Sequence, residues 1–317
     1  MIEFGYKLSS EEQSPNDLVR YARRAEDAGF TFAAISDHFH PWTSRQGQSP
    51  FVWNVIGAIG HATTDLKLGT AVTCPTIRIH PAVVAQAAAT SAAMMPGRFW
   101  LGIGSGENLN EHVTGARWPQ TKVRQDMMVE AIEVIRTLFE GGMQSHHGRY
   151  YTVENARLYT LEDRPPIYVA ASGNRAARLA GEHADGLICV APSDDTVKRF
   201  DAAGGAGKPK YAEVNVCWAR TEEEAKRTAL EWWPVAGLGG TLMQELALPS
   251  HFEAACEPLD AEQVSETLAV GPDPDVHIES IRKFVEAGFD HVWIHQIGPD
   301  QDGFFDFYEK QVLPKVR

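Results

Sequence analysis

Short runs rich in β-branched and aromatic residues alternate along the chain with longer segments whose apolar residues recur at helical spacing. The short runs predict eight strands, at residues 2–7, 30–36, 66–72, 99–103, 167–171, 186–190, 211–219 and 291–294. The longer segments predict helices, of which the clearest are 15–28, 51–62, 81–95 and about 122–139. Ser14 and Pro15 supply an N-cap and a first helical position for the earliest helix, and Gly29 ends it.

Strand followed by helix, repeated eight times, indicates parallel strands, because neighbouring parallel strands are joined by crossover helices. We therefore expect an α/β fold, a closed (β/α)8 TIM barrel formed by a single domain over residues 1–317. An open, doubly wound parallel sheet is the alternative.

Two stretches depart from the repeat and are expected to be insertions. The first, about 141–163, predicts a hairpin with strands at 149–153 and 156–160, and the second, about 237–260, is apolar and contains proline. In TIM barrels the active site lies at the C-terminal ends of the strands. Insertions after the strands are therefore candidate walls of a substrate pocket.

Composition narrows the class of protein. The chain has 29 Lys+Arg against 42 Asp+Glu, a net charge of −13, and 44% hydrophobic residues, which suits a globular protein with a large core. The acidic balance argues against a nucleic-acid binder or a protein of anionic membranes. Neither a secretion signal nor a stretch of about 18 apolar residues is found. The four cysteines are widely separated, which favours reduced thiols and a cytoplasmic protein.

Common cofactor signatures fail. Residues 102–107 read GIGSGE, with Glu107 where a dinucleotide fingerprint needs Gly or Ala. Residues 207–209 read GKP and lack the other residues of a phosphate-binding P-loop. Asp37, His38 and His40 lie close together, but no third cluster of ligands accompanies them, so we predict no metal site.

Three predicted strand ends carry unusual chemistry. The second strand ends in SDHFHPW (36–42), an acid, two imidazoles and an indole, and the fourth ends in GSGENLNE (104–111), where small residues allow a flat ligand to approach. After the fifth strand, AASGNRA (170–176) opens a helix whose free N–H groups suit a phosphate. A hydrogen-bonded structural histidine, a solvated loop and an ordinary helix start are the plainer interpretations. All three segments follow predicted barrel strands, and this shared position favours a functional site over the plainer interpretations.

Taken together, these segments resemble the luciferase-like barrel oxidoreductases, and within them the branch that uses the deazaflavin coenzyme F420 and includes the F420-dependent glucose-6-phosphate dehydrogenases. The similarity runs nearly end to end, in the family's order, through FGYKLSSEEQSP, SDHFHPW, LGTAVTCPT, HPAVVAQAAAT, GRFWLGIGSGENLNEHVTG, YVAASG and ADGLICV. SDHFHPW paired with GSGENLNE is highly specific, whereas neither segment is specific alone.

The resemblance implies roles for individual residues. His38 and Glu107 match the family's catalytic pair, and Trp42 matches its active-site indole. The positions that match the family's coenzyme contacts are Asp37, Ala71, Val72, Cys74, Ser105, Gly106, Asn110, Ser172, Gly173, Arg175 and Ala176, although Thr is common where Cys74 stands. The resemblance also implies a non-proline cis peptide bond at Ala71–Val72, the bulge on which the deazaflavin ring rests.

The chain departs from the family at the substrate phosphate. The sugar-phosphate enzymes hold this group with one Thr, two Lys and one Arg, and the matching positions here are Val190, Ser193, Met243 and Thr267. A desolvated dianion without cationic partners is costly. We therefore expect these four positions to bind a neutral or apolar alcohol or an unphosphorylated sugar, and we do not expect glucose 6-phosphate to be the substrate.

A deazaflavin exchanges a hydride, so the resemblance implies reversible oxidation of a secondary alcohol or a hemiacetal carbon. His38 would accept the hydroxyl proton and Glu107 would donate a proton, or the two roles are reversed, and Trp42 would wall the substrate pocket. The alternatives are an FMN-dependent luciferase-like monooxygenase, which needs a reductase and oxygen, and a barrel that binds a ligand without turning it over. Family members are often dimers, so a homodimer is expected.

Overall fold

Eight parallel strands close into a barrel in the computed structural model, which describes residues 2–317. In chain order they are β1 (Glu3–Leu8), β2 (Phe32–Ile35), β3 (Lys67–Thr70), β4 (Phe99–Ile103), β7 (Ile167–Ala170), β8 (Gly186–Cys189), β9 (Lys210–Cys217) and β11 (His291–Gln296). Neighbours pair in the order β9-β11-β1-β2-β3-β4-β7-β8, and pairing of β8 with β9 closes the ring. The closed barrel is confirmed over the open sheet.

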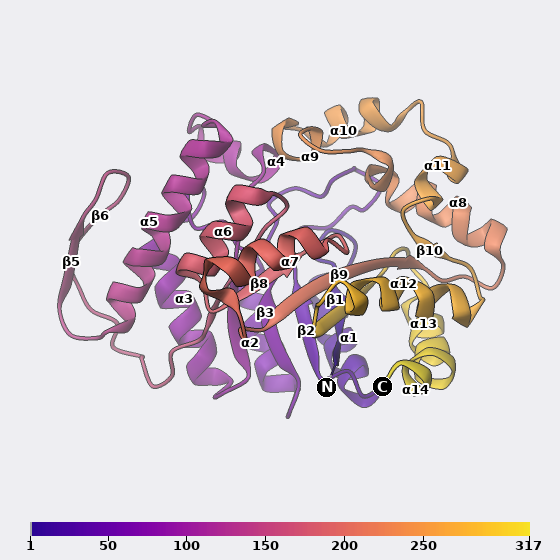
Figure 1. The fold of residues 1–317 in the computed structure, drawn as a ribbon, viewed down its shortest axis with the longest axis horizontal. Helices are drawn as coiled ribbons and strands as arrows, with labels where there is room; N and C mark the ends of the chain where they lie inside the picture. Colours follow the sequence, from indigo (N-terminus) through magenta and orange to yellow (C-terminus); the bar gives the residue numbers. More distant parts are fainter. Residues whose placement is uncertain (1) are drawn as a thin grey trace.

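Helices surround the strands, and the two ends of the chain lie close together beneath the barrel (Figure 1). The helices that alternate with the barrel strands are α1 (Pro15–Asp27), α2 (Val52–Ala62), α3 (Pro81–Met94), α5 (Thr121–Phe139), α6 (Asn174–His183), α7 (Asp194–Phe200), α8 (Glu222–Trp232), α12 (Pro274–Glu286) and α13 (Gln301–Phe307). Helix α1 begins as predicted, because the Ser14 hydroxyl accepts the Asp17 N–H at its N-cap. Among residues 2–317, no helix has both the length and the hydropathy to cross a membrane.

Large rings fill the lower half of the barrel. The aromatic side chains that meet there come from five different strands and are Phe32, Trp100, Tyr168, Tyr211 and Trp293. Gly69 on β3 makes room for one of them, since a Cβ at this position would lie 1.9 Å from the indole of Trp100. This packed layer, called the aromatic floor below, leaves the upper ends of the strands as the place for a ligand.

The first insertion is a hairpin, but its strands differ from the prediction. They are β5 (Gln144–His147) and β6 (Thr152–Ala156), not 149–153 and 156–160. The reason is Glu130 on α5, whose carboxylate accepts the backbone N–H groups of Arg149, Tyr150 and Tyr151 and so holds them in the turn. The hairpin follows α5 and extends along the flank of the molecule beside it, away from the α9–α10 end (Figure 1).

The second insertion is part of a longer excursion between β9 and α12. It contains α8, α9 (Leu242–Glu245), α10 (Pro249–Cys256) and α11 (Ala261–Ser265), and then β10 (Ala269–Val270), which the sequence did not predict. Strand β10 pairs with the end of β9, where Ala269 lies opposite Val216. In Figure 1, α9 and α10 lie at the end of the barrel where the strands finish, beside α4 (Asn108–Glu111).

Candidate active site

The ends of β2 and β4 bring His38 and Glu107 together, although they are far apart in the sequence. The Nε2 atom of His38 lies 3.4 Å from the Oε2 atom of Glu107. The imidazole is buried, whereas the Glu107 side chain keeps 32% of its exposure. Burial and the nearby Glu11 raise the pKa of Glu107, and this outweighs the opposing effect of His38. The two side chains predicted as a catalytic pair therefore face each other in one site.

A third group, Glu11, contacts the other side of the imidazole and was missed by the sequence reasoning. Its Oε1 atom lies 3.3 Å from Nδ1 of His38, and its Oε2 atom accepts hydrogen bonds from the hydroxyls of Ser9 and Ser36. Burial alone raises the pKa of Glu11, but the charges of His38 and Lys7 and the Ser36 hydrogen bond lower it to about 2. Glu11 is therefore a carboxylate at neutral pH.

Trp42 covers the imidazole on the side that faces α10. Its ring meets that of His38 edge-on, with the centroids 5.0 Å apart, and meets the ring of Phe252 on α10 at 5.2 Å. The indole is buried in a second apolar cluster, which also includes Leu109 and Trp233. The predicted indole thus lies between the histidine and the second insertion.

Asp37 and Asn110 were predicted to contact a coenzyme, yet their side chains are engaged within the protein. The Asp37 carboxylate accepts hydrogen bonds from Thr73 Oγ1 and Arg78 Nη2, each at 2.8 Å, and is fully buried. Asn110 Oδ1 accepts the N–H groups of residues 39 and 40, and its Nδ2 donates to Glu107 Oε2 at 3.0 Å. Asp37 thus links the end of β2 to the segment after β3, and Asn110 links the loop after β2 to Glu107. Contact of either side chain with a coenzyme stays a prediction.

Small and partly exposed residues line the ends of β3 and β4. The peptide bond Ala71–Val72 is cis, as the resemblance implies, and the carbonyl of Ala71 accepts a hydrogen bond from Lys7. Gly106 has a φ of +82°, and a Cβ there would lie 2.6 Å from the sulfur of Cys74. Ser105 and Gly106 both keep intermediate exposure. The backbone can therefore be approached closely at this edge of the site.

The start of α6 is open. Gly173 is its N-cap and provides no side-chain acceptor, so the first N–H groups of the helix, including that of Ala176, lack a side-chain cap. A Cβ at Gly173 would meet no atom within 4 Å, and Ser172 is exposed. The guanidinium of Arg175 is paired with Asp126 and Gln125 on α5. An anion at this helix start would thus be bound by backbone N–H groups and not by a free cation.

The four predicted substrate positions lie in different environments. Val190 is exposed, and the Ser193 hydroxyl caps α7 by accepting the Thr196 N–H. The Thr267 hydroxyl donates to the carbonyl of Val264, in the turn after α11. Met243 packs against the apolar cluster that contains Trp42, so it is the position among the four that the structure links to the catalytic residues.

Metal ligation finds no support in the part of the chain that the structure describes, where no three His, Cys, Asp or Glu side chains converge to hold an ion. The site is instead defined by one imidazole between two carboxyl groups, an indole, a Gly-lined edge and an open helix start.

Comparison with known proteins agrees with this architecture. Residues 1–291 match the family model described as luciferase-like monooxygenase. The F420-dependent glucose-6-phosphate dehydrogenase of Nocardia farcinica is 37% identical over 331 aligned residues, covering 100% of this chain and 98% of the relative. The corresponding protein of Nakamurella multipartita is 38% identical, covering 100% of this chain and 97% of the relative.

A solved structure is similarly close. An F420-dependent secondary alcohol dehydrogenase in complex with an F420–acetone adduct superposes with a TM-score of 0.92 at 31% identity, covering 100% of this chain and 99% of the other. The F420-dependent tetrahydromethanopterin reductase of Methanopyrus kandleri, at 22% identity and a TM-score of 0.80, shares the fold. The family match spans most of the chain and the relatives are aligned along its whole length, so this chain belongs to the luciferase-like family.

Proposed function

We propose that this protein is a coenzyme F420-dependent oxidoreductase that transfers a hydride between a secondary alcohol or sugar hydroxyl, not phosphorylated, and the deazaflavin. The observation that carries the proposal is the buried imidazole of His38 lying 3.4 Å from Glu107 and 3.3 Å from Glu11 at the barrel mouth. Relatives that are named as F420-dependent dehydrogenases support the choice of coenzyme and of reaction.

The residues present suit such a coenzyme. Ala71, Val72 and Gly106 are partly exposed at the ends of β3 and β4, so a flat ring can approach the backbone there. The uncapped start of α6 at Gly173 offers N–H groups to the coenzyme's anionic part. When bound, a deazaflavin accepts or donates a hydride at a ring carbon.

The protein's own groups would manage the proton. Glu11 holds a negative charge against Nδ1 of His38, which leaves Nε2 to accept the proton of a substrate hydroxyl. Glu107 has a raised pKa and so retains its proton to a higher pH, which suits a donor. Two carboxyl groups whose pKa values are pushed apart thus favour His38 as base and Glu107 as acid, of the two assignments that the sequence left open.

The state of the cations near the barrel mouth favours an uncharged substrate. Lys7 and Arg78 already have carboxylate partners and are not free to bind a phosphate. Lys7 pairs with Glu213 at 3.0 Å, and Arg78 pairs with Asp37 at 2.8 Å. Val190 and Met243, which stand where the sugar-phosphate enzymes have phosphate ligands, carry no positive charge. A phosphate dianion would therefore lose water without gaining a free cation.

A substrate screen tests the proposal. With F420 present, unphosphorylated secondary alcohols and sugars are expected to bleach the visible absorbance of the oxidised coenzyme, and glucose 6-phosphate is expected to react more slowly. Tight binding of FMN with oxygen consumption instead would establish the monooxygenase alternative. A strong preference for glucose 6-phosphate would refute the assignment of an unphosphorylated substrate, and no hydride transfer with any of them would refute the activity.

Substitution of the pair tests its role. His38→Ala and Glu107→Gln are each expected to lower kcat by about 10² or more, the usual contribution of general acid–base catalysis. Coenzyme affinity, measured by fluorescence titration, should change little in both. His147→Ala, at an exposed histidine on β5, serves as the matched control. Wild-type turnover in either pair variant would remove that residue from the mechanism.

The ionised state of Glu11 has a measurable consequence for stability. Because the folded-state pKa of about 2 lies below the ordinary value of 4.5, ionisation of Glu11 stabilises the fold above pH 4.5 and this contribution is lost as the pH falls towards 2. The full contribution is about 3 kcal/mol. Urea unfolding at pH 5 and pH 3 should therefore show a smaller loss for Glu11→Gln than for wild type. The exposed Glu133→Gln is the control, and equal pH dependence in all three proteins would contradict the low pKa.

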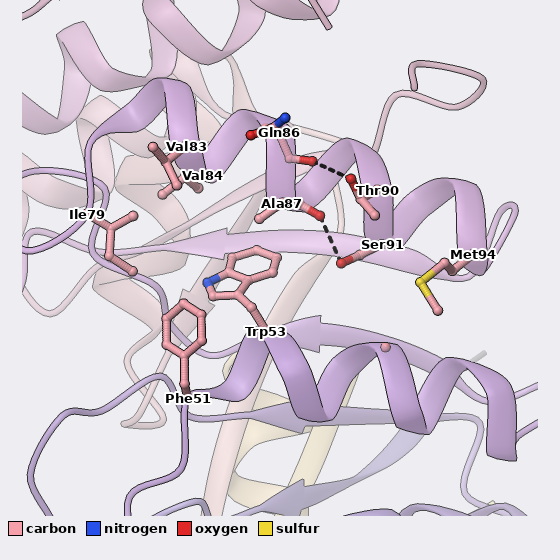
Figure 2. Close-up of a pocket in the computed structure, with 11 residues that line it drawn as sticks. Phe51, Trp53, Ile79, Val83, Val84, Gln86, Ala87, Thr90, Ser91 and Met94 are labelled. Carbon is pink, nitrogen blue, oxygen red and sulfur yellow. Dashed lines mark hydrogen bonds between the residues drawn. The ribbon is translucent and has the colours of Figure 1, made fainter. Parts of the chain in front are cut away.

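The outer face of α2 and α3 fits a second copy of this chain. The two helices, of 11 and 14 residues, contain no Asp, Glu, Lys or Arg. A groove of about 290 Å³ lies between them. Figure 2 shows Trp53 and Phe51 on one side of this groove and Val83 on the other. Phe51 and Val83 are each 54% exposed and Met94 is 48% exposed. We infer a homodimer through this face, since a contiguous uncharged surface marks an interface.

The cellular compartment is inferred from the cysteines. All four are free, which favours a cytoplasmic enzyme.

Light scattering after size exclusion checks the dimer. The wild-type protein should run at twice the chain mass of 34.9 kDa, and Val83→Lys combined with Met94→Lys should run at the chain mass. Val276→Lys, at an exposed apolar residue on α12, is the control and should stay dimeric. A monomeric wild type, or a dimeric double variant, would rule this interface out.

A further inference from the structure

The segment 242–256, which contains α9 and α10 and is called the cap below, lies against both catalytic strand ends. On one side, Phe252 meets Trp42, and Glu253 accepts the N–H of Ser44 at 2.8 Å. On the other side, Asn108 Nδ2 donates to the carbonyl of Glu245 at 3.0 Å. Asn108 directly follows Glu107, so the cap is hydrogen-bonded to the same short segment that carries the raised-pKa carboxyl group.

Arg124, near the start of α5, is fully buried where it meets the cap. Its guanidinium lies 4.0 Å over the ring of Trp118. Its hydrogen-bond acceptors come from its own helix start and from the cap, and they are Pro119 O at 2.6 Å, Thr121 Oγ1 at 3.2 Å, Gln244 Oε1 at 3.0 Å and Glu245 Oε1 at 3.2 Å.

The burial of this guanidinium depends on the cap. A buried cation is stable only when it is paired and hydrogen-bonded, and Glu245 is its carboxylate partner. If the cap moved away, Arg124 would lose both the charge of Glu245 and the amide oxygen of Gln244. The docked position of α9 is therefore the one that gives both terminal nitrogens of Arg124 their acceptors from the cap.

The docked cap places apolar side chains against the cluster that contains Trp42. Met243 and Leu246 flank the two residues that Arg124 holds, and both pack against the cluster that contains Trp42 and Phe252. Because Arg124 binds Gln244 and Glu245, the flanking residues are held against the cluster that contains Trp42. The cap surface that results presents hydrocarbon and aromatic side chains.

We propose that Arg124 is a positioning residue that fixes the cap as the wall of the substrate pocket, and that this wall selects alcohols with an apolar carbon skeleton. The proposal rests on the proposed function for the substrate's chemistry. Arg124 does not touch the catalytic side chains, so its effect falls on substrate binding. The wall favours an apolar alcohol over a sugar, because the many hydroxyl groups of a sugar would lack hydrogen-bond partners against Met243 and Leu246.

The first test replaces Arg124 with a side chain of similar length and no charge. Arg124→Met is expected to raise KM for an apolar secondary alcohol about tenfold, with kcat changed less and the coenzyme dissociation constant unchanged. Arg124→Lys, which retains the charge, should recover part of the loss. Arg136→Met removes an exposed, paired arginine from the same helix and should leave KM at the wild-type value. Unchanged KM in Arg124→Met, or an equal rise in the coenzyme dissociation constant, would overturn the assignment.

A second pair of measurements does not depend on turnover. Glu245→Ala combined with Gln244→Ala alters the cap side, where Glu245 is 42% exposed, so this variant leaves the α5 side of the contact in place. Hydrogen exchange of residues 238–248 should be faster in this variant and in Arg124→Met, and unchanged in Arg136→Met. Unaltered exchange would refute the docking role. Faster exchange with no turnover of any alcohol by wild type would uphold docking and refute the proposed function, and sugars outperforming apolar alcohols would refute the selectivity.

Discussion

An imidazole held between two carboxyl groups of unlike acidity is the interaction on which the site depends. Glu11 is kept ionised by its hydroxyl donors and by neighbouring positive charge, whereas Glu107 is made less acidic by its surroundings. His38 therefore has one ring nitrogen facing a permanent anion and the other facing a group that more readily keeps its proton. This asymmetry gives the imidazole a direction along which a proton can move, which symmetric surroundings would not provide.

The scaffold maintains this asymmetry with groups that do not themselves face a substrate. Arg78 donates to the Asp37 carboxylate, and its backbone N–H donates to Glu111, so three successive strand ends are joined by buried charge. Asn110 links the loop after β2 to Glu107. Removal of any one partner would leave a buried polar group unsatisfied, which is why such networks hold their geometry firmly.

The sequence predicted the barrel because its signals are local: strand periodicity, the Ser14–Pro15 start and the polar residues at strand ends are each contained within a few positions. It also located His38, Glu107 and Trp42, whose place follows from barrel topology. Glu11, Arg78 and Arg124 could not be found in this way. Their importance arises from partners many residues away, and nothing local distinguishes a buried pair from a solvated charge. The predicted bounds of the hairpin strands were wrong for the same reason, because Glu130 on α5 holds the turn from another element.

The aromatic floor divides the barrel into a lower half that is packed core and an upper half that carries the candidate site. Rings from five strands fill the lower half, and Gly69 has no room for even a methyl group there, so this half tolerates little change. The cap packs in a separate apolar cluster with Trp42, whereas at the strand ends Ala71 and Val72 still pack against the floor. Diversification of substrate choice can therefore proceed in the cap while the cost in foldability stays low, which makes this barrel a suitable starting point for redesigning alcohol selectivity.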